Sequence, residues 1–312
     1  MDALAGLLDG PRARDAFLLR VVMGRPWSIR VQDEAPLSVV AVVRGRGWVM
    51  PDDGDAVELV PGDVAVARGP VPYTFSDDPA SPTQIVIHPD QRCTTPGGVE
   101  LVEALALGVR TWGTDLDGPD DMLVGTYNLE GDVSRRLLHA LPQLIVVRGD
   151  ELGSPIVDLL SGEMAKDDPG QEAVLDRLLD VLLIATLRAW FDRPGADAPA
   201  WYRAQGDPIV GRALRLIYNH PARRWTVASL ASEAGVSRAA LARRFTDLVG
   251  EPPMAFLTEW RLTLAADLLR DPDETLASVA YQVGYSSPFA LSTAFKRARG
   301  ISPREHRLAA TG

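Results

Sequence analysis

The 312-residue sequence has little cysteine and histidine and contains no long apolar run. Its single cysteine, Cys93, excludes an intrachain disulfide and is typical of proteins in a reducing cytoplasm. No segment approaches the roughly 20 apolar residues that span a bilayer. Residues 1–10 place no cationic stretch before an apolar one, so no secretory signal is expected. These absences predict a cytoplasmic protein without a membrane partner.

Positive charge is also scarce, and it is unevenly distributed. The net charge is −10, but residues 205–312 contain 14 Arg and Lys against 10 Asp and Glu, a net of +4. The preceding residues contain 18 basic and 32 acidic residues, a net of −14. The mildly basic last third suits nucleic-acid binding. The acidic remainder either discourages non-specific DNA binding or serves solubility alone.

The first half of the chain predicts short strands. Clusters of Gly, Pro and Asp separate β-branched and aromatic segments, which is typical of an antiparallel barrel or sandwich. The predicted strands cover residues 17–22, 28–31, 37–43, 47–50, 56–60, 64–66, 84–87 and 122–129.

From residue 154 the pattern becomes helical. Asp168 and Pro169 predict a cap and a first helical residue. The helix that follows has a broad apolar surface, which packs either on the barrel alone or also on a second subunit of a homodimer. Residues 192–199 are rich in Pro, Asp and Ala and predict a linker. We therefore expect three segments, residues 1–150, 151–204 and 205–312.

A sequence repeat near the C-terminus carries the most information. Leu230-Ala231, Gly235, Ser237, Leu241 and Phe245 recur 49 or 50 residues later as Val279-Ala280, Gly284, Ser287, Leu291 and Phe295. Each copy predicts a helix, a glycine turn and a second helix, and the small alanine permits close helix crossing. We expect Thr226 to cap the first helix of the first copy, Ser237 and Ser287 to cap the two second helices, and Ser302 and Glu305 to form a capping box. Two such units in tandem predict a DNA-binding module.

The segment Gly-Tyr-Ser-Ser-Pro-Phe-Ala-Leu-Ser-Thr-Ala-Phe-Lys-Arg-Ala-Arg-Gly-Ile-Ser-Pro-Arg-Glu-His-Arg (284–307) resembles the C-terminal signature of AraC-type transcriptional regulators. Residues 230–256 are similar to the first helix-turn-helix of that family. The resemblance implies two recognition helices in successive major-groove segments, ~34 Å apart. It implies DNA contact by Ser237, Arg238, Ala239, Ala242, Arg243, Arg244, Ser287, Phe289, Ser292, Thr293, Lys296 and Arg297.

Within this set we assign different tasks to different side chains. Arg243 is expected to bind a guanine edge, because a guanidinium donates two hydrogen bonds to O6 and N7. The other arginines of the two helices, Arg299 included, and Lys296 are expected to contact phosphates. Thr293 stands where family members often have a base-contacting arginine, so the second helix is expected to contact thymine methyls and backbone. In the alternative, Phe289 is partly buried and this helix contributes mainly affinity.

The strand-rich half resembles a cupin domain, with Leu37 to Trp48 and Pro61-Gly62-Asp63 matching its two motifs. Catalytic cupins have metal-binding histidines at positions occupied here by Ser38, Val40 and Tyr73, and His88, His139, His220 and His306 lie elsewhere. We therefore expect no metal and no other cofactor. A small-molecule effector would bind in the barrel mouth. The candidate residues are Trp27, Trp48, Tyr73, Phe75, His88 and Cys93, although each also suits a structural role. Arg92 beside Cys93 would lower the thiol pKa and make it a sensor of oxidants or electrophiles.

The expected fold is an N-terminal cupin-like antiparallel β-barrel with accessory helices, followed by an all-α double helix-turn-helix. The expected function is a sequence-specific regulator that binds double-stranded DNA, responds to a small molecule and forms a homodimer. It would also contact RNA polymerase if it activates transcription. Two alternatives are a metal-dependent cupin enzyme with a structural helical tail and a DNA-bending protein without a signal.

Overall fold

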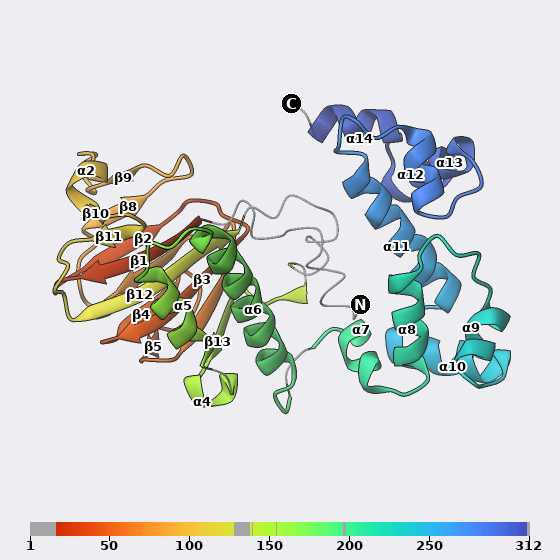
Figure 1. The fold of residues 1–312 in the computed structure, drawn as a ribbon, viewed down its shortest axis with the longest axis horizontal. Helices are drawn as coiled ribbons and strands as arrows, with labels where there is room; N and C mark the ends of the chain where they lie inside the picture. The colour runs from red at the N-terminus through yellow and green to blue at the C-terminus, as the bar shows by residue number, and fades with distance from the viewer. Residues whose placement is uncertain (1–16, 128–137, 139, 154, 196–197, 311–312) are drawn as a thin grey trace. The chain divides into compact units, whose positions relative to one another are not determined.

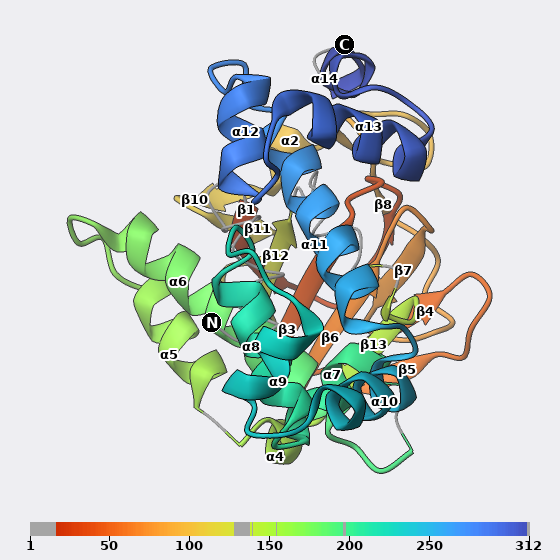
Figure 2. The ribbon, with the colours of Figure 1, turned by 90° about the vertical axis from the view of Figure 1, so that its right-hand side faces the viewer.

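The computed structural model describes residues 17–127, 138, 140–153, 155–195 and 198–310. The described residues up to 195 belong to one compact unit, and those from 198 onward belong to a second. Figures 1 and 2 show the first unit as sheets with a few helices and the second as helices only. His139 and the last two residues of the predicted strand 122–129 lie outside the described residues.

Two sheets form the first unit. The seven-stranded sheet has the order β10 (Ala106–Gly108), β11 (Thr111–Gly113), β1 (Phe17–Met23), β12 (Asp120–Tyr127), β3 (Leu37–Arg44), β6 (Val64–Arg68) and β13 (Leu144–Val147). The six-stranded sheet has the order β5 (Val57–Leu59), β4 (Gly47–Pro51), β7 (Tyr73–Ser76), β2 (Ser28–Val31), β8 (Ile85–Ile87) and β9 (Cys93–Thr94). Buried side chains from both sheets form one core, which gives the predicted cupin-like architecture.

The strand pairing is mostly antiparallel, as predicted, with two exceptions. β1 pairs with β11 in parallel, and β2 pairs with β8 in parallel. Each predicted strand has a counterpart in the two sheets. The sequence did not predict β7, β9, β10, β11 and β13, all of which have only two to four residues.

Helices cover part of the seven-stranded sheet. α5 (Ile156–Met164) packs on β3, and α6 (Gln171–Phe191) packs on β13, while the two helices also contact each other (Figure 1). Two one-turn helices, α2 (Val102–Leu105) and α4 (Gly149–Leu152), also lie in the described part of this unit. The predicted cap of α6 was wrong, because Gly170 in the left-handed region (φ 84°) precedes the helix and Asp168 contributes only a backbone carbonyl.

A buried carboxylate joins distant segments of this unit. Asp120 is fully buried and accepts hydrogen bonds from Nη2 of Arg25 at 2.6 Å and from Nε1 of Trp27 at 2.9 Å. The backbone N–H of Arg46 donates to the same carboxylate at 3.1 Å. A buried charge requires such partners, because an unpaired one loses its hydration without compensation. Although burial raises the pKa of Asp120, these hydrogen bonds hold it below its ordinary value.

The second unit contains both helix-turn-helix motifs. A short entry of α7 (Ala200–Arg203) and the 3-10 turn η2 (Ala204–Gly206) leads into α8 (Val210–Asn219). The first motif consists of α9 (Val227–Glu233) and α10 (Arg238–Val249), and the second of α12 (Leu276–Gln282) and α13 (Pro288–Arg299). The long helix α11 (Pro253–Leu268) runs between them, and α14 (Pro303–Ala310) follows the second motif (Figure 2).

The repeat produces two similar cores. Leu241 and Phe245 are fully buried on α10, and Leu291 and Phe295 are fully buried on α13. In the first core, Phe256 packs edge-to-face against Phe245 and against Tyr218. In the second core the residues of α13 pack with Leu262, Ala265, Val279 and Ala280.

The predicted helix starts of this unit are confirmed. Ser237 and Ser287 accept hydrogen bonds from the backbone N–H groups of Ala240 and Ala290, both at 3.2 Å. Thr226 begins α9 with a reciprocal bond to Ser229, and Ser302 and Glu305 make the predicted capping box. These caps fix where both recognition helices begin.

Candidate nucleic-acid interface and ligand cavity

The first recognition helix, α10, exposes one face to solvent while Leu241 and Phe245 anchor the other. Arg238, Ala239 and Arg243 are exposed, and Ala242 is half-exposed. Their spacing of one, three and four residues places these side chains on one side of the helix. A surface with two guanidinium groups and two alanines is small enough, and suitably charged, to enter the major groove.

The second recognition helix, α13, has a different surface. Phe289 is 81% exposed, so the alternative in which it is partly buried is wrong. Thr293 lies one turn later, and its hydroxyl donates to the Phe289 carbonyl at 3.0 Å. Ser292 is half-exposed, and Lys296 and Arg297 are exposed at the end of the helix. No acidic residue occurs from Gly284 to Gly300.

The cations of the two recognition helices fall into two groups. Arg238, Arg243, Lys296 and Arg297 have no ion pair among the described residues. Arg244 instead donates to Asp207 at 2.5 Å, and Arg299 lies 3.1 Å from Glu259 of α11. The pairing of Arg244 holds the pKa of Asp207 at about 2. Both paired arginines were predicted to contact phosphates, but each has an intramolecular carboxylate partner that was not predicted.

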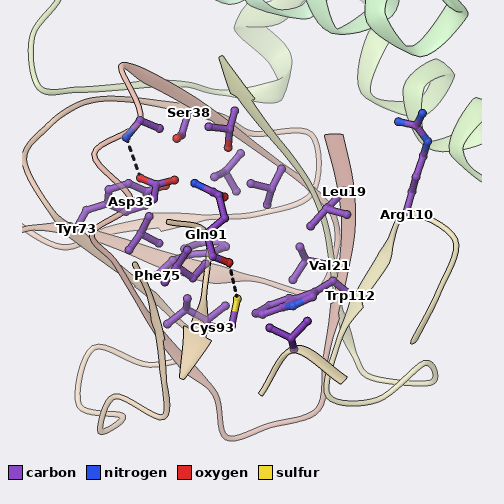
Figure 3. Close-up of a pocket in the computed structure, with 18 of the residues that line it drawn as sticks. Leu19, Val21, Asp33, Ser38, Tyr73, Phe75, Gln91, Cys93, Arg110 and Trp112 are labelled. Carbon is purple, nitrogen blue, oxygen red and sulfur yellow. Dashed lines mark hydrogen bonds between the residues drawn. The ribbon is translucent and has the colours of Figure 1, made fainter. Parts of the chain in front are cut away.

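The first unit encloses a cavity of about 600 Å³ between the two sheets. Most of its walls are aliphatic or aromatic side chains, including Leu19, Val21, Phe75 and Trp112 (Figure 3). The polar lining side chains are Asp33, Glu34, Ser38, Tyr73, Gln91, Cys93, Arg110, Thr111 and Thr126. A largely apolar pocket of this size with a few polar groups is typical of small-molecule sites.

Three of the six predicted effector-binding residues line this cavity, namely Tyr73, Phe75 and Cys93. The other three, Trp27, Trp48 and His88, do not belong to its lining. Trp27 is fully buried and donates to Asp120, and the His88 ring is hydrogen-bonded to Thr94 at 2.9 Å. Sequence reasoning missed Asp33, Gln91 and Trp112, because strand pairing brings them to the cavity from separate segments.

The environment of Cys93 differs from the predicted one. Its side chain is buried beside the cavity, and burial raises the pKa of the thiol. Arg92 donates to Asp90 at 2.5 Å, so its charge is already paired. The predicted lowering of the thiol pKa by Arg92 is therefore wrong.

The positions expected for metal ligands also lie in the cavity wall. Ser38, Val40 and Tyr73 all line it, and none of the three supplies an imidazole. In the described part of the chain, no three His, Cys, Asp or Glu side chains gather closely enough to hold a metal ion. The described helices include none long and apolar enough to cross a membrane.

Comparison with known proteins finds a cupin family over residues 2–192 and a helix-turn-helix domain family over residues 230–309. An AraC-like transcription regulator of Streptomyces lividans is 32% identical over 98% of both chains. The HTH-type transcriptional regulator AlkR of Acinetobacter baylyi is 27% identical over 98% of this chain and 99% of its own. The crystal structure of the DNA-binding domain of AdpA with a target DNA is 34% identical, covers 33% of this chain and 93% of that chain, and has a TM-score of 0.32.

A cupin domain followed by two helix-turn-helix motifs defines a transcription regulator that binds double-stranded DNA. The chain belongs to the AraC-type transcriptional regulators with an N-terminal cupin domain. The relatives that match over its full length are regulators, so the alternative of a metal-dependent cupin enzyme is not favoured.

Proposed function

We propose that a small molecule bound in the N-terminal cavity controls the DNA affinity of this regulator. The observation that carries the proposal is the apolar cavity of about 600 Å³ in the same chain as two recognition helices. Residues 1–150 would bind the effector, residues 151–204 would support dimerisation, and residues 205–312 would bind the operator. Control requires that the ligand bind unequally to two states of the protein, since equal binding shifts no equilibrium.

The two recognition helices have separate tasks in this proposal. Arg243 contacts a guanine, because its guanidinium is exposed and has no ion pair among the described residues. Phe289 and Thr293 contact thymine methyls from α13, where both are exposed. Arg238, Lys296 and Arg297 contact phosphates. The remaining side chains lie against the DNA backbone or the bases, namely Ser237, Ala239, Ala242, Ser287 and Ser292.

A homodimer is part of the proposal. α6 buries Leu175, Leu179 and Leu187 yet leaves Val174 and Val181 exposed by 44% and 49%. An exposed apolar stripe on a long helix suits a second copy of the chain. Light scattering should give twice the monomer mass, and Val181→Glu should return the protein to a monomer. If the protein activates transcription, it would also contact RNA polymerase. DNA binding and this contact would take place in the cytoplasm.

A selection of genomic fragments by the purified full-length protein tests operator binding. We expect a shared motif that covers about two helical turns, which is the span of two successive major-groove segments. Arg243→Ala should relax the preference at one base pair by ~1–3 kcal/mol. Arg297→Ala should weaken binding to all sequences and flatten the salt dependence. Arg215→Ala, an exposed cation of α8, is the matched control.

Identical effects of Arg243→Ala and Arg297→Ala would contradict these assignments. Recovery of no motif, with or without extracts that contain effectors, would favour non-specific binding. Affinity that never changes with any ligand of the cavity would contradict control by an effector.

A further inference from the structure

We propose that the cavity binds an apolar molecule with a cationic head group, such as a protonated amine, and that the head lies beside Asp33. This inference rests on the proposed function in that the cavity is the effector site, and it adds the chemical class of the ligand. It can be tested by binding alone, without DNA.

The apolar walls of the cavity indicate that the body of the ligand is apolar. Leu19, Val21 and Trp112 lie together on one side of the cavity in Figure 3, and Phe75, Val31 and Ile87 add apolar surface elsewhere in its lining. These walls present almost no hydrogen-bonding group, so a polar ligand would lose its hydration without replacement. An alkyl chain or a fused hydrocarbon ring gains free energy by leaving water.

The opposite side of the cavity indicates the charge of the ligand head group. Figure 3 shows Asp33, Ser38 and Tyr73 together, away from Leu19 and Trp112. The Asp33 carboxylate accepts the Ala35 backbone N–H at 3.1 Å, and the Gln91 side chain is its other hydrogen-bond donor besides its own backbone. All of these donors are neutral, and no Arg or Lys among the described residues forms an ion pair with Asp33. Asp33 is half-buried, so its carboxylate is partly removed from water and is left without a counter-charge.

Two titration shifts agree with this geometry. Burial raises the pKa of Asp33, which is the response of a carboxylate that lacks a cationic partner. Burial, with Asp33 as the next cause, raises the pKa of Tyr73 far above its ordinary range. Tyr73 therefore stays a neutral phenol, hydrogen-bonded with Ser38 and close enough to Asp33 to feel its charge. A cation placed here would meet one carboxylate and two hydroxyl oxygens.

The cavity lining has one basic residue, and its position does not favour an anionic ligand. The Arg110 guanidinium points away from the cavity in Figure 3 and lies 3.7 Å from the Glu172 carboxylate. Glu34, which follows Asp33, adds a second carboxylate to the lining. The described lining residues therefore have two acidic groups and one basic group that is already paired.

Three probes with the same chain separate the head groups: n-decylammonium, n-decanol and n-decanoate. Isothermal titration of the full-length protein at pH 7, below the micelle concentration, should give the tightest binding for n-decylammonium and the weakest for n-decanoate. The charge-assisted bond predicts an advantage of about tenfold to a hundredfold over n-decanol. Asp33→Asn keeps the shape and the acceptor for Ala35, and it should remove most of this advantage while n-decanol binds within about twofold. Asp53→Asn, an exposed carboxylate outside the lining, controls for the lost charge.

The proposal is overturned if n-decanoate binds as tightly as n-decylammonium, if Asp33→Asn leaves the ratio of ammonium to alcohol affinity unchanged, or if none of the three probes binds. DNA affinity measured with and without n-decylammonium separates the two proposals. Binding that depends on Asp33 without any change in DNA affinity would support the ligand class and contradict control of DNA binding by the cavity.

Discussion

The two glycine turns of the helix-turn-helix motifs offer a matched pair of substitutions. Gly235 and Gly284 occupy the same position of the repeat, and both have left-handed backbones, with φ of +74° and +82°. An alanine at either position therefore meets the same conformational penalty, roughly 1–2 kcal/mol. Their surroundings differ, and this difference is what the experiment measures.

A Cβ on Gly235 would meet no atom within 4 Å, whereas a Cβ on Gly284 would lie 2.6 Å from the Ala222 carbonyl oxygen and 2.7 Å from its Cα. These are backbone atoms of the segment between α8 and α9, so no flexible side chain can move aside. Forcing an extra carbon into such a contact costs about 1–3 kcal/mol more. We expect Gly235→Ala to lower the unfolding free energy by roughly 1–2 kcal/mol and Gly284→Ala by roughly 2–5 kcal/mol.

Urea denaturation of the fragment 198–312, followed by circular dichroism at 222 nm, measures both losses in one compact unit. Gly284→Ala should also weaken operator binding more than Gly235→Ala, because Ala222 belongs to the segment that precedes the first motif. Equal losses, within about 0.5 kcal/mol, would mean that the second turn does not pack against this segment and would refute the reasoning.

Three further substitutions test ion pairs of the two units. Asp207→Asn breaks the ion pair with Arg244 and should lower the unfolding free energy at pH 7 by about 1–2 kcal/mol. The loss is no larger because Arg244 is exposed and solvent screens the pair. The pKa of Asp207 is held at about 2, below its ordinary value, so urea titrations should show this difference at neutral pH and its loss as the pH falls from about 4 towards 2. Asp120→Ala removes the buried partner of Arg25 and should cost the first unit about 3–5 kcal/mol, measured by calorimetry, and a loss below about 1 kcal/mol would contradict its structural role. Arg299→Ala should lower stability yet leave the salt dependence of DNA binding unchanged, and a flatter slope would place this side chain on a phosphate after all.

The features predicted correctly from sequence are those fixed by neighbouring residues. Ser237 and Ser287 were assigned as caps because a serine before a helix needs only the N–H groups two or three residues later. The buried faces of α10 and α13 follow from the spacing of Leu241, Phe245, Leu291 and Phe295. Local rules were sufficient there because each interaction closes within one turn of helix.

The features that sequence did not predict depend on partners far along the chain. Arg244 was assigned to phosphate because its carboxylate partner, Asp207, lies 37 residues earlier. Trp27 was placed in the effector site, yet its indole N–H reaches Asp120, 93 residues later. Among the described residues, the order of the strands decides which side chains face the cavity. Strands as short as β9 and β11 have too little periodicity to be predicted. No sequence pattern around Asp33, which lies two residues after β2, identifies it as a cavity residue.

Equivalent positions of the two repeats have unlike side chains. Arg243 and Thr293 occupy equivalent positions, as do Ala239 and Phe289, so each repeat has one large side chain where the other has a small one. On α10 the large group is a guanidinium that can donate two hydrogen bonds, and on α13 it is an exposed phenyl ring that can donate none. If Arg243 contacts a guanine and Phe289 a thymine methyl, as we propose, the two motifs need unlike half-sites. We infer that one subunit binds its operator in a single orientation, since reversing it would place the ring against the guanine and the guanidinium against the thymine methyl.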